Sequence, residues 1–310
     1  MINIALVGIG KIARDQHIHA INNSETWSLA AAVSRNGTID GIENYVDFHH
    51  MLEARQDIRV VSLTMPPVPR FDFAMAALNA GRHVMLEKPP GATISECQAL
   101  LDTAHQNRVS IYATWHSRMA EMVPAAKDWL SGKKIKRLAI IWKEDVRRWH
   151  PNQDWIWQAG GLGVFDPGIN ALSIMTELLE DPVHLTSATL DIPENKDCPI
   201  AAHLRFVHPH GGDVRAEFDW RQTGDQIWTI EIETDNGNLT LLDGGARMVI
   251  NDVETTSDDT LLNGEYPRLY ANFAELINGG QSEMDLTPLQ HVADAFLLGR
   301  RMTTKPFIEN

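Results

Sequence analysis

The chain has 310 residues, 44% of them hydrophobic, which favours two domains with packed cores and excludes a disordered chain. Its formal net charge of −14 disfavours nucleic acid or an anionic membrane surface as a partner, because both would be repelled at long range. Cys97 and Cys198 form no disulfide or metal pattern, and we find no signal peptide or membrane-spanning apolar run, so we expect a cytoplasmic protein.

Short apolar runs alternate with helical patterns through the first 118 residues. Strands are expected at residues 2–7, 27–33, 59–64, 83–86 and 109–113. Helices are expected at 71–79 and 95–107, the second with Ser95 as its N-cap. Strands that alternate with helices of this length indicate βαβ units, so the first domain is predicted to be α/β with a parallel sheet.

The pattern changes after residue 118. A strand at 138–142 and a Gly-rich entry to a helix at 161–179 precede longer segments whose apolar residues alternate, as at 213–220. Asn236-Gly237 predicts a hairpin with positive φ at both turn positions. Residues 119–310 are therefore predicted to form an α+β domain with a largely antiparallel sheet. The helix expected at 288–301 could pack back on the first domain.

The first chemical motif is a G-x-G-x-x-A sequence that follows the first strand and opens a helix. Gly8 permits a tight turn, Gly10 allows a pyrophosphate to approach the backbone, and Ala13 allows close packing of helix on sheet. Lys11 and Ile12 belong to the same segment. In this context the motif predicts dinucleotide binding at the helix N-terminus. The alternative is a Gly-rich turn that binds nothing.

Ser34 and Arg35 end the second predicted strand. Enzymes that use NAD usually carry Asp or Glu here for the ribose 2′-hydroxyl. An arginine can instead pair with a 2′-phosphate, and a serine hydroxyl can hydrogen-bond to it. We therefore expect NADP as the cofactor, with NAD as a possible substitute. The alternative is an exposed arginine on an ordinary loop.

Glu87-Lys88-Pro89-Pro90 closes the fourth strand, at the sheet edge where ligands bind in open α/β folds. Lys88 could hydrogen-bond to a substrate oxygen and adjust the pKa of a neighbouring group. The spacing alone equally allows a solvated lysine before a proline turn.

A Gly-rich segment at residues 160–168 leads to Asp166, and Asn170 follows one helical turn later. A helix that includes both would present a carboxylate and an amide on one face. An Asp before a Pro is equally typical of a helix N-cap followed by Pro at the first helical position.

Aromatic and polar residues gather just before that segment: Trp142, Glu144, Arg147, Trp149, His150, Trp155 and Trp157. Sugars offer apolar C–H faces to aromatic rings and hydroxyls to polar side chains, so the cluster favours a sugar ligand. The alternative is a Trp-rich interface or core edge. We expect no metal site, because no histidine pair has the spacing or the cysteine partners of a zinc site.

These motifs, in this order, resemble the Gfo/Idh/MocA family of NAD(P)-dependent oxidoreductases. The resemblance covers essentially the whole chain. It implies a Rossmann domain at 1–118 and a second α/β domain at 119–310 whose open sheet forms a homodimer interface. It also implies that Lys88 and Asp166 line the active site. The expected cofactor-binding residues are Gly8, Gly10, Lys11, Ile12, Ala13, Ser34, Arg35, Glu87 and Lys88.

Two positions depart from the family pattern. The family often has a histidine where this chain has Asn170, and an amide cannot act as a base. The family also often has a histidine after the proline pair that ends the third strand, where this chain has Arg70. The role of that histidine is therefore open in this chain.

The Asn170 variant, Ser34-Arg35 and Trp149-His150-Pro151 most resemble the aldose 1-dehydrogenases of the family. These act on L-arabinose, D-galactose and D-fucose. The resemblance implies oxidation of the anomeric hydroxyl to a lactone, with Asp166 taking the proton, Lys88 stabilising the oxygen and Asn170 orienting the hydroxyl. The remaining implied sugar contacts are His116, Glu144, Trp149, His150 and Trp228. The alternatives are oxidation of a cyclic polyol or reaction at a ring keto group, and a non-catalytic NADP-binding sensor.

Overall fold

The computed structural model describes residues 1–255 and 264–309. Residue contacts divide the chain into two compact units, one formed by residues 1–116 with 262–286 and the other by 117–261 with 287–310. This differs from the expected division at residue 118. A late segment belongs to the first unit, while the helix expected at 288–301 groups with the second. Among the described residues, no helix combines the length and hydropathy needed to cross a bilayer.

The first unit contains a six-stranded parallel sheet in the order β3-β2-β1-β4-β5-β6. Its strands are β1 (Ile2–Val7), β2 (Trp27–Val33), β3 (Glu43–Tyr45), β4 (Val60–Leu63), β5 (His83–Glu87) and β6 (Ile111–Thr114). Because every strand runs in the same direction, all carboxyl ends meet at one edge of the sheet. The α/β class predicted for this part is confirmed.

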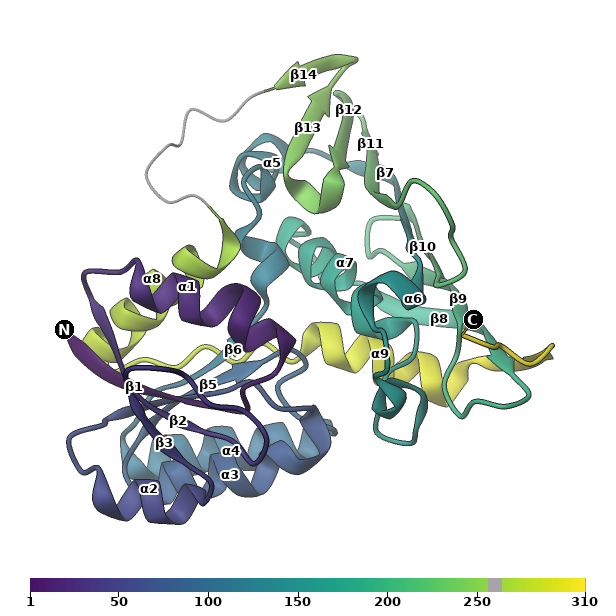
Figure 1. Ribbon diagram of the computed structural model, residues 1–310. Coiled ribbons are helices and arrows are strands. Elements are labelled where there is room, and N and C mark those ends of the chain that lie inside the picture. The colour runs from purple at the N-terminus through teal and green to yellow at the C-terminus, as the bar shows by residue number, and fades with distance from the viewer. Residues whose placement is uncertain (256–263, 310) are drawn as a thin grey trace. The chain divides into compact units, whose positions relative to one another are not determined.

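Helices cover both faces of this sheet (Figure 1). One face carries α2 (Phe48–Ala54), α3 (Pro67–Asn79) and α4 (Ile94–Asn107), whose apolar residues share a core with β1, β4 and β5. The other face carries the π-helical turn Ala13–His17, α1 (Ile18–Asn22) and α8 (Glu265–Gly279). Ala13 and Ile9 pack there beside Leu6 and Ala32, which is the close packing expected of the alanine in the motif.

Helix α8 was not predicted, and it supplies much of the second face. Tyr266, Leu269, Tyr270 and Phe273 are all buried. The Phe273 ring stacks on Trp27 of β2, and the Trp27 indole N–H donates to the Tyr270 carbonyl at 3.0 Å. The first unit is therefore completed by chain that lies between the two sequence segments of the second unit.

The start of α4 corrects the predicted N-cap. The helix begins at Ile94, and Thr93 caps it by accepting a hydrogen bond from the Glu96 backbone N–H at 3.2 Å. The Glu96 carboxylate accepts from the Thr93 backbone N–H in return, which completes a capping box. Ser95, the predicted cap, lies one position inside the helix.

The second unit is built on a nine-stranded sheet in the order β14-β13-β12-β11-β7-β10-β9-β8-β15. Strand pairs β7–β10 and β8–β15 are parallel and the other pairs are antiparallel, as the predicted largely antiparallel sheet requires. The strands are β7 (Ile135–Lys143), β8 (His184–Pro193), β9 (Ala201–Val207), β10 (Asp213–Asp219), β11 (Ile227–Thr234), β12 (Gly237–Leu242), β13 (Arg247–Ile250), β14 (Val253–Thr255) and β15 (Arg300–Thr304).

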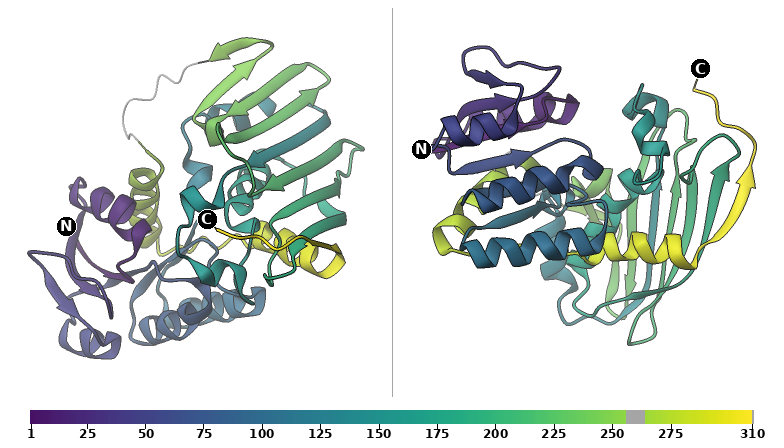
Figure 2. Two further views of the ribbon diagram at one scale, coloured as in Figure 1. Left: turned by 45° about the vertical axis from the view of Figure 1, so that its right-hand side comes forward. Right: turned by 90° about the horizontal axis from the view of Figure 1, so that it is seen from below.

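Two long helices, α7 (Phe165–Leu178) and α9 (Thr287–Leu298), pack on one face of this sheet (Figure 2). The shorter α5 (Val123–Leu130) packs against α7, and the single turn α6 (Val146–Trp149) follows β7. Phe165 meets Phe218 of β10 edge to face, with the ring centroids 5.9 Å apart, so the start of α7 is held directly on the sheet. The opposite face of the sheet exposes His203, Arg205 and Arg215.

The hairpin predicted at Asn236-Gly237 is present, but its turn lies one residue earlier. Thr234 pairs with Gly237, so the connecting residues are Asp235 and Asn236. Only Gly237 has positive φ, at 111°, whereas positive φ was expected at Asn236 as well. The Thr234 hydroxyl accepts from the Asn236 N–H and donates to the Gly237 carbonyl, which stabilises this alternative turn.

Candidate active site

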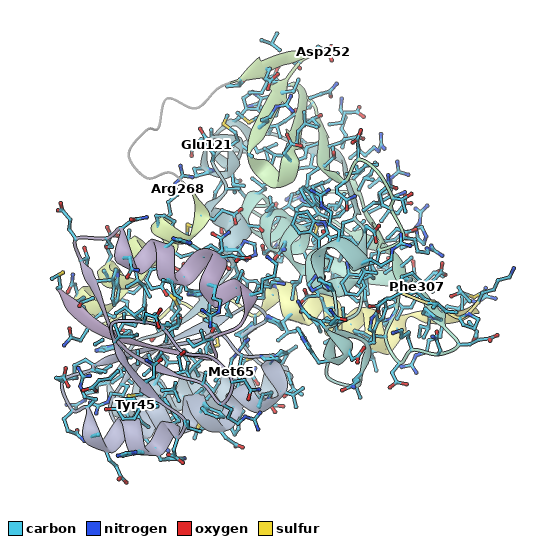
Figure 3. All side chains as sticks on the ribbon, in the orientation of Figure 1. Tyr45, Met65, Glu121, Asp252, Arg268 and Phe307 are labelled. Carbon is cyan, nitrogen blue, oxygen red and sulfur yellow. The ribbon has the colours of Figure 1, made fainter. Side chains whose placement is uncertain are left out.

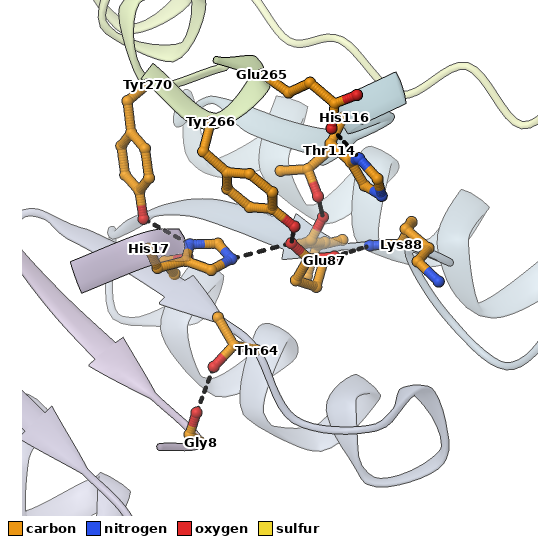
Figure 4. Close-up of polar contacts among 12 residues, drawn as sticks. Gly8, His17, Thr64, Glu87, Lys88, Thr114, His116, Glu265, Tyr266 and Tyr270 are labelled. Atoms are coloured by element: carbon orange, nitrogen blue, oxygen red, sulfur yellow. Dashed lines mark hydrogen bonds and ion pairs between the residues drawn. The ribbon is translucent and has the colours of Figure 1, made fainter. Parts of the chain in front are cut away.

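The Gly-rich turn after β1 is shaped for close approach of a ligand. Gly8 has φ of 94°, and a Cβ there would lie 2.8 Å from the Met65 backbone nitrogen, so only glycine fits. The Thr64 hydroxyl donates to the Gly8 carbonyl and fixes the turn (Figure 4). A Cβ on Gly10 would meet no described atom within 4 Å, so its backbone is accessible. An open turn that leads into a helix fits the pyrophosphate of a dinucleotide.

The loop after β2 lies at the same edge of the sheet. The Ser34 hydroxyl oxygen accepts from the Gly37 N–H at 3.2 Å, which leaves its own hydrogen free to donate. Arg35 is exposed, and the Arg14 guanidinium donates to the Thr38 carbonyl at 3.2 Å. The loop thus offers a hydroxyl and a guanidinium for an anion. Lys11, also predicted to bind cofactor, pairs with Asp15.

Glu87 forms the centre of a buried network at the end of β5 (Figure 4). One carboxylate oxygen accepts from the Tyr266 hydroxyl at 2.7 Å and contacts His17 Nε2 at 2.9 Å, and the other accepts from the Lys88 N–H at 2.9 Å. His17 Nδ1 lies 2.7 Å from the Tyr270 hydroxyl. The Glu87 carboxylate therefore positions the Lys88 backbone. Glu87 was expected to contact the cofactor, and no motif in the sequence indicated His17, Tyr266 or Tyr270.

Glu87 is ionised despite its burial. Burial by itself would raise the pKa of this carboxyl, but the hydrogen bond and charge of His17, the charge of His116 and the Tyr266 hydroxyl outweigh it and hold the pKa at about 2. The Glu87 carboxylate therefore places a fixed negative charge beside the Lys88 backbone.

Arg70, at the position where the family often has a histidine, is a clamp for the same region. Arg70 is 2% exposed, and its guanidinium donates to the backbone carbonyls of Met65, Glu87 and Pro89. These bonds connect the residues that follow β4 with those that follow β5. Arg70 thus holds the backbone on both sides of Lys88.

His116 lies beside the same network. Its Nδ1 is 2.6 Å from a Glu265 carboxylate oxygen, and its ring stacks on Tyr266 with centroids 5.6 Å apart. Burial would lower the pKa of His116, but the charges of Glu265 and Glu87 outweigh it and raise the pKa above its ordinary value. A protonated imidazole can donate to a hydroxyl or an anionic oxygen.

The second cluster lies in the second unit, at the start of α7. The helix begins at Phe165, and Asp166 lies inside its first turn without capping it, so the N-cap alternative is wrong. The helix N-terminus stabilises a negative charge at this position. Asp166 Oδ2 is 3.3 Å from His150 Nε2, and its side chain is 6% exposed. Asn170 follows on the same helix and is half-buried.

Glu144 organises the tryptophans of this cluster. Its two carboxylate oxygens accept hydrogen bonds from the indole N–H groups of Trp220 and Trp228, at 3.2 and 3.1 Å. The half-buried Trp228 contacts the ring of Trp149, with centroids 5.5 Å apart. The fully buried Trp220 packs against the His150 ring at 5.3 Å. Trp220 was not predicted as a site residue, although it ends a clean alternating strand.

The remaining tryptophans divide between core and support. Trp142 is buried. Trp157 contacts the C-terminal tail, in which Phe307 is labelled in Figure 3. The Trp157 indole N–H donates to the Glu309 carboxylate at 2.9 Å, and the Phe307 ring packs on the Trp157 ring. The interpretation of the Trp-rich segment as partly core is therefore correct for these two residues. Trp149 and Trp228 are left as half-buried aromatic surface beside Glu144.

The chain is 40% identical over 308 residues to the galactose 1-dehydrogenase of Pseudomonas fluorescens, covering 99% of both sequences. Residues 2–114 match the model of the Gfo/Idh/MocA oxidoreductase family, described as an NAD-binding Rossmann fold. The chain belongs to the Gfo/Idh/MocA oxidoreductase family. The resemblance on which the sequence analysis relied is confirmed, and the first unit is a Rossmann domain that binds a nicotinamide dinucleotide.

Two solved structures are similar to this chain over nearly its whole length. The D-galactose-1-dehydrogenase from Rhizobium etli is 52% identical and superposes with a TM-score of 0.94 over 99% of this chain and 98% of that one. A 3-ketoreductase from Actinomadura kijaniata, solved with NADP and TDP-benzene, has a TM-score of 0.82 over 98% of this chain and 99% of its own, at 18% identity. The second likeness concerns the fold alone.

Proposed function

We propose that this protein is an aldose 1-dehydrogenase that oxidises the anomeric hydroxyl of an aldopyranose to the lactone, with NADP preferred over NAD. The observation that carries the proposal is the pairing of Asp166 with His150 beside the hydrogen-bonded pair of Glu144 and Trp228. All four residues belong to the second unit. It joins a proton acceptor to a polar and aromatic surface of the kind that sugars bind. Two relatives named galactose 1-dehydrogenases, at 40% and 52% identity over nearly the whole chain, support the same substrate class.

The proposed substrates are D-galactose, D-fucose and L-arabinose, which share their ring configuration at C2 to C4. The apolar C–H face of the ring would lie on Trp149 or Trp228. The sugar hydroxyls would bind Glu144, His150 and His116. A buried carboxylate that already accepts two indole N–H groups is rigid, and rigid acceptors discriminate between hydroxyl configurations because an unpaired buried group is costly.

The chemistry needs a base and a stabilising charge, and the bound nicotinamide supplies the hydride acceptor. Asp166 takes the proton from the anomeric hydroxyl. Lys88, whose backbone is fixed by Glu87 and Arg70, stabilises the oxygen. Asn170 orients the hydroxyl from the next turn of α7. An anomeric hydroxyl is more acidic than an ordinary alcohol, so a carboxylate is a sufficient base.

The preference for NADP rests on the loop after β2. Ser34 and the exposed Arg35 replace the carboxylate that would bind a ribose 2′-hydroxyl and repel a 2′-phosphate. We also infer a cytoplasmic homodimer formed through the open face of the nine-stranded sheet. Its support is the family resemblance and the exposed residues His203, Arg205 and Arg215 on that face.

The test is the initial rate of reduced-nicotinamide formation with a panel of aldoses and cyclic polyols, each with NADP and with NAD. We expect turnover of D-galactose or L-arabinose, faster with NADP, and a lactone product by NMR. Asp166→Ala and Lys88→Ala should each lower kcat by at least about 100-fold while dinucleotide binding is retained. Turnover of a polyol alone would move the reaction away from C1. Binding of NADP without turnover of any sugar would make the protein a sensor.

A further inference from the structure

Asp166 has a second proton-binding group as its neighbour. His150 lies at the end of α6, and its Nε2 is 3.3 Å from Asp166 Oδ2. This distance suits a hydrogen bond only if one proton lies between the two atoms, because an ionised carboxylate and an unprotonated ring nitrogen are both acceptors. The pair can therefore hold or release one proton as a unit.

The neighbour of His150 Nδ1 favours one tautomer of the ring. His150 Nδ1 lies 3.3 Å from the carboxamide oxygen of Gln153, and a carboxamide oxygen can only accept. This arrangement favours the neutral tautomer that carries its proton on Nδ1, in which the Nε2 lone pair is directed at Asp166. A neutral His150 in this tautomer is ready to accept a proton from Asp166.

The side chains of Asp166 and His150 differ in their exposure to solvent. The Asp166 side chain is 6% exposed and that of His150 is 16% exposed. His150 begins a loop in which Pro151 and Asn152 are exposed, and Gln153 is half-buried. His150 is therefore the more exposed of the two proton-binding groups.

We propose that His150 is a proton-relay residue that acts through Asp166. This inference rests on the proposed function. As the sugar is oxidised, the C1–H electron pair passes to the nicotinamide as hydride and the hydroxyl O–H bond breaks, its proton moving to Asp166 Oδ2. That proton then passes to His150 Nε2, and the imidazolium loses the Nδ1 proton to solvent beside Gln153. Exchange with water, in which Nδ1 gains a proton and Nε2 loses one, then restores the starting tautomer, so one proton is released for each turnover.

The relay also accounts for Asn170. The amide of Asn170 accepts hydrogen bonds but cannot act as a base, so this position of α7 offers no second base for the proton. His150 supplies an imidazole from a different element, the loop after α6, at hydrogen-bond distance from the same carboxylate. His150 thus has a role beyond contact with a sugar hydroxyl.

Two substitutions separate relay from contact in the full-length enzyme. His150→Gln keeps an N–H near Asp166 but cannot accept a proton, and His150→Ala leaves space for free imidazole. We expect both to lower kcat by about 10- to 100-fold, a larger change than the rise in KM for D-galactose that loss of a sugar contact causes. Added imidazole should restore kcat in His150→Ala and not in His150→Gln. The solvent deuterium isotope effect on kcat should increase in both variants.

A matched control is His184→Gln, at an exposed position of β8 in the same unit, which should behave as wild type. Wild-type kcat in His150→Gln, a rise in KM alone, or failure of imidazole to restore His150→Ala would each overturn the relay. If the His150 variants do not fold, Gln153→Leu tests the same idea, because it releases the Nδ1–H bond. The relay requires a lower kcat in Gln153→Leu, and an unchanged kcat would contradict it.

A readout without substrate keeps this inference separate from the proposed function. Nitrogen-15 NMR of the cofactor-free protein at alkaline pH should show His150 protonated on Nδ1. An Nε2-protonated ring would overturn the relay whatever the substrate. If the wild-type enzyme oxidises no aldose, the proposed function fails, and the NMR result alone then decides whether the pair is arranged to share a proton.

Discussion

Buried charges at this site are tolerated because each has several partners. Glu87 is 4% exposed, yet its carboxylate contacts the Tyr266 hydroxyl, His17 and the Lys88 N–H. Glu144 is 5% exposed and accepts two indole N–H groups. Such groups are rigid, since moving one of them would leave a donor unpaired in a low-dielectric environment.

Glu87 should make folding sensitive to acid. Because its folded pKa of about 2 lies below the ordinary value of 4.5, its stabilisation is complete above 4.5 and is lost as the pH falls toward 2. Glu87→Gln should lower the free energy of unfolding by about 3 kcal/mol at neutral pH, and this difference should shrink through that window. Urea unfolding at several pH values measures it. Glu53→Gln, at an exposed position, is the control and should show no such trend.

Arg35 should determine the choice between the two dinucleotides. A charge-assisted hydrogen bond to a phosphate contributes about 1.5–3 kcal/mol, so Arg35→Ala should weaken NADP binding about 10- to 100-fold and leave NAD binding nearly unchanged. Titration calorimetry with both dinucleotides measures this. Arg59→Ala, an exposed arginine at the amino end of β4, should change neither affinity. Equal losses for NADP and NAD in Arg35→Ala would contradict the assignment of a 2′-phosphate site.

At the scale of elements, the site depends on where strands and helices begin and end. The carboxyl ends of β1, β2, β4 and β5 bring Gly8, Ser34, Thr64 and Lys88 to one edge of a sheet. The first turn of α7 supplies Asp166 to the other cluster, with His150 from the loop after α6. Helix ends leave backbone N–H groups unpaired, so capping residues decide where a helix begins.

The correction at α4 can be tested directly. Thr93→Ala removes the hydroxyl that accepts from Glu96 N–H and should lower the free energy of unfolding by about 1 kcal/mol. Ser95→Ala, two residues later on an exposed side of the same helix, should change it by less than about 0.5 kcal/mol. Chemical denaturation of the two variants gives the comparison. A larger loss of unfolding free energy in Ser95→Ala than in Thr93→Ala would show that Ser95 is the N-cap, as expected from the sequence.

At the scale of the whole molecule, neither compact unit is a continuous stretch of chain. The first unit consists of residues 1–116 and 262–286, and the second of residues 117–261 and 287–310. Helix α8 contributes Tyr266 and Tyr270 to the network around Glu87, and Phe273 to the core beside Trp27. A polypeptide that ends where the last strand of the parallel sheet ends would lack these groups.

A fragment of residues 1–118 should therefore fail to fold cooperatively. It would expose the apolar face that α8 covers and leave His17 and Glu87 without their tyrosine partners. The same fragment joined to residues 264–286 by a flexible linker should show a cooperative thermal transition and bind the dinucleotide. Near-UV circular dichroism and nucleotide titration distinguish the two fragments. A cooperative, nucleotide-binding 1–118 fragment would show that α8 is dispensable.

Local patterns in the amino-acid sequence were enough to predict several elements and the residues at their ends. The alternation of apolar runs placed β1, β2, β4 and β5, and Gly8 and Lys88 at their ends. Helical spacing placed Asp166 and Asn170 in one helix, and the departure at Asn170 pointed to the aldose branch of the family. These inferences succeed because periodicity and turn chemistry act over a few residues.

Contacts between residues far apart in the sequence became known from the packing of the elements. Glu87 contacts Tyr266, 179 residues away, and Glu144 accepts from Trp228, 84 residues away. The pairing of His150 with Asp166 and the position of α8 in the first unit depend equally on how the elements pack. Sequence spacing carries no record of such contacts, because they are selected by burial and by the need to pair each buried polar group.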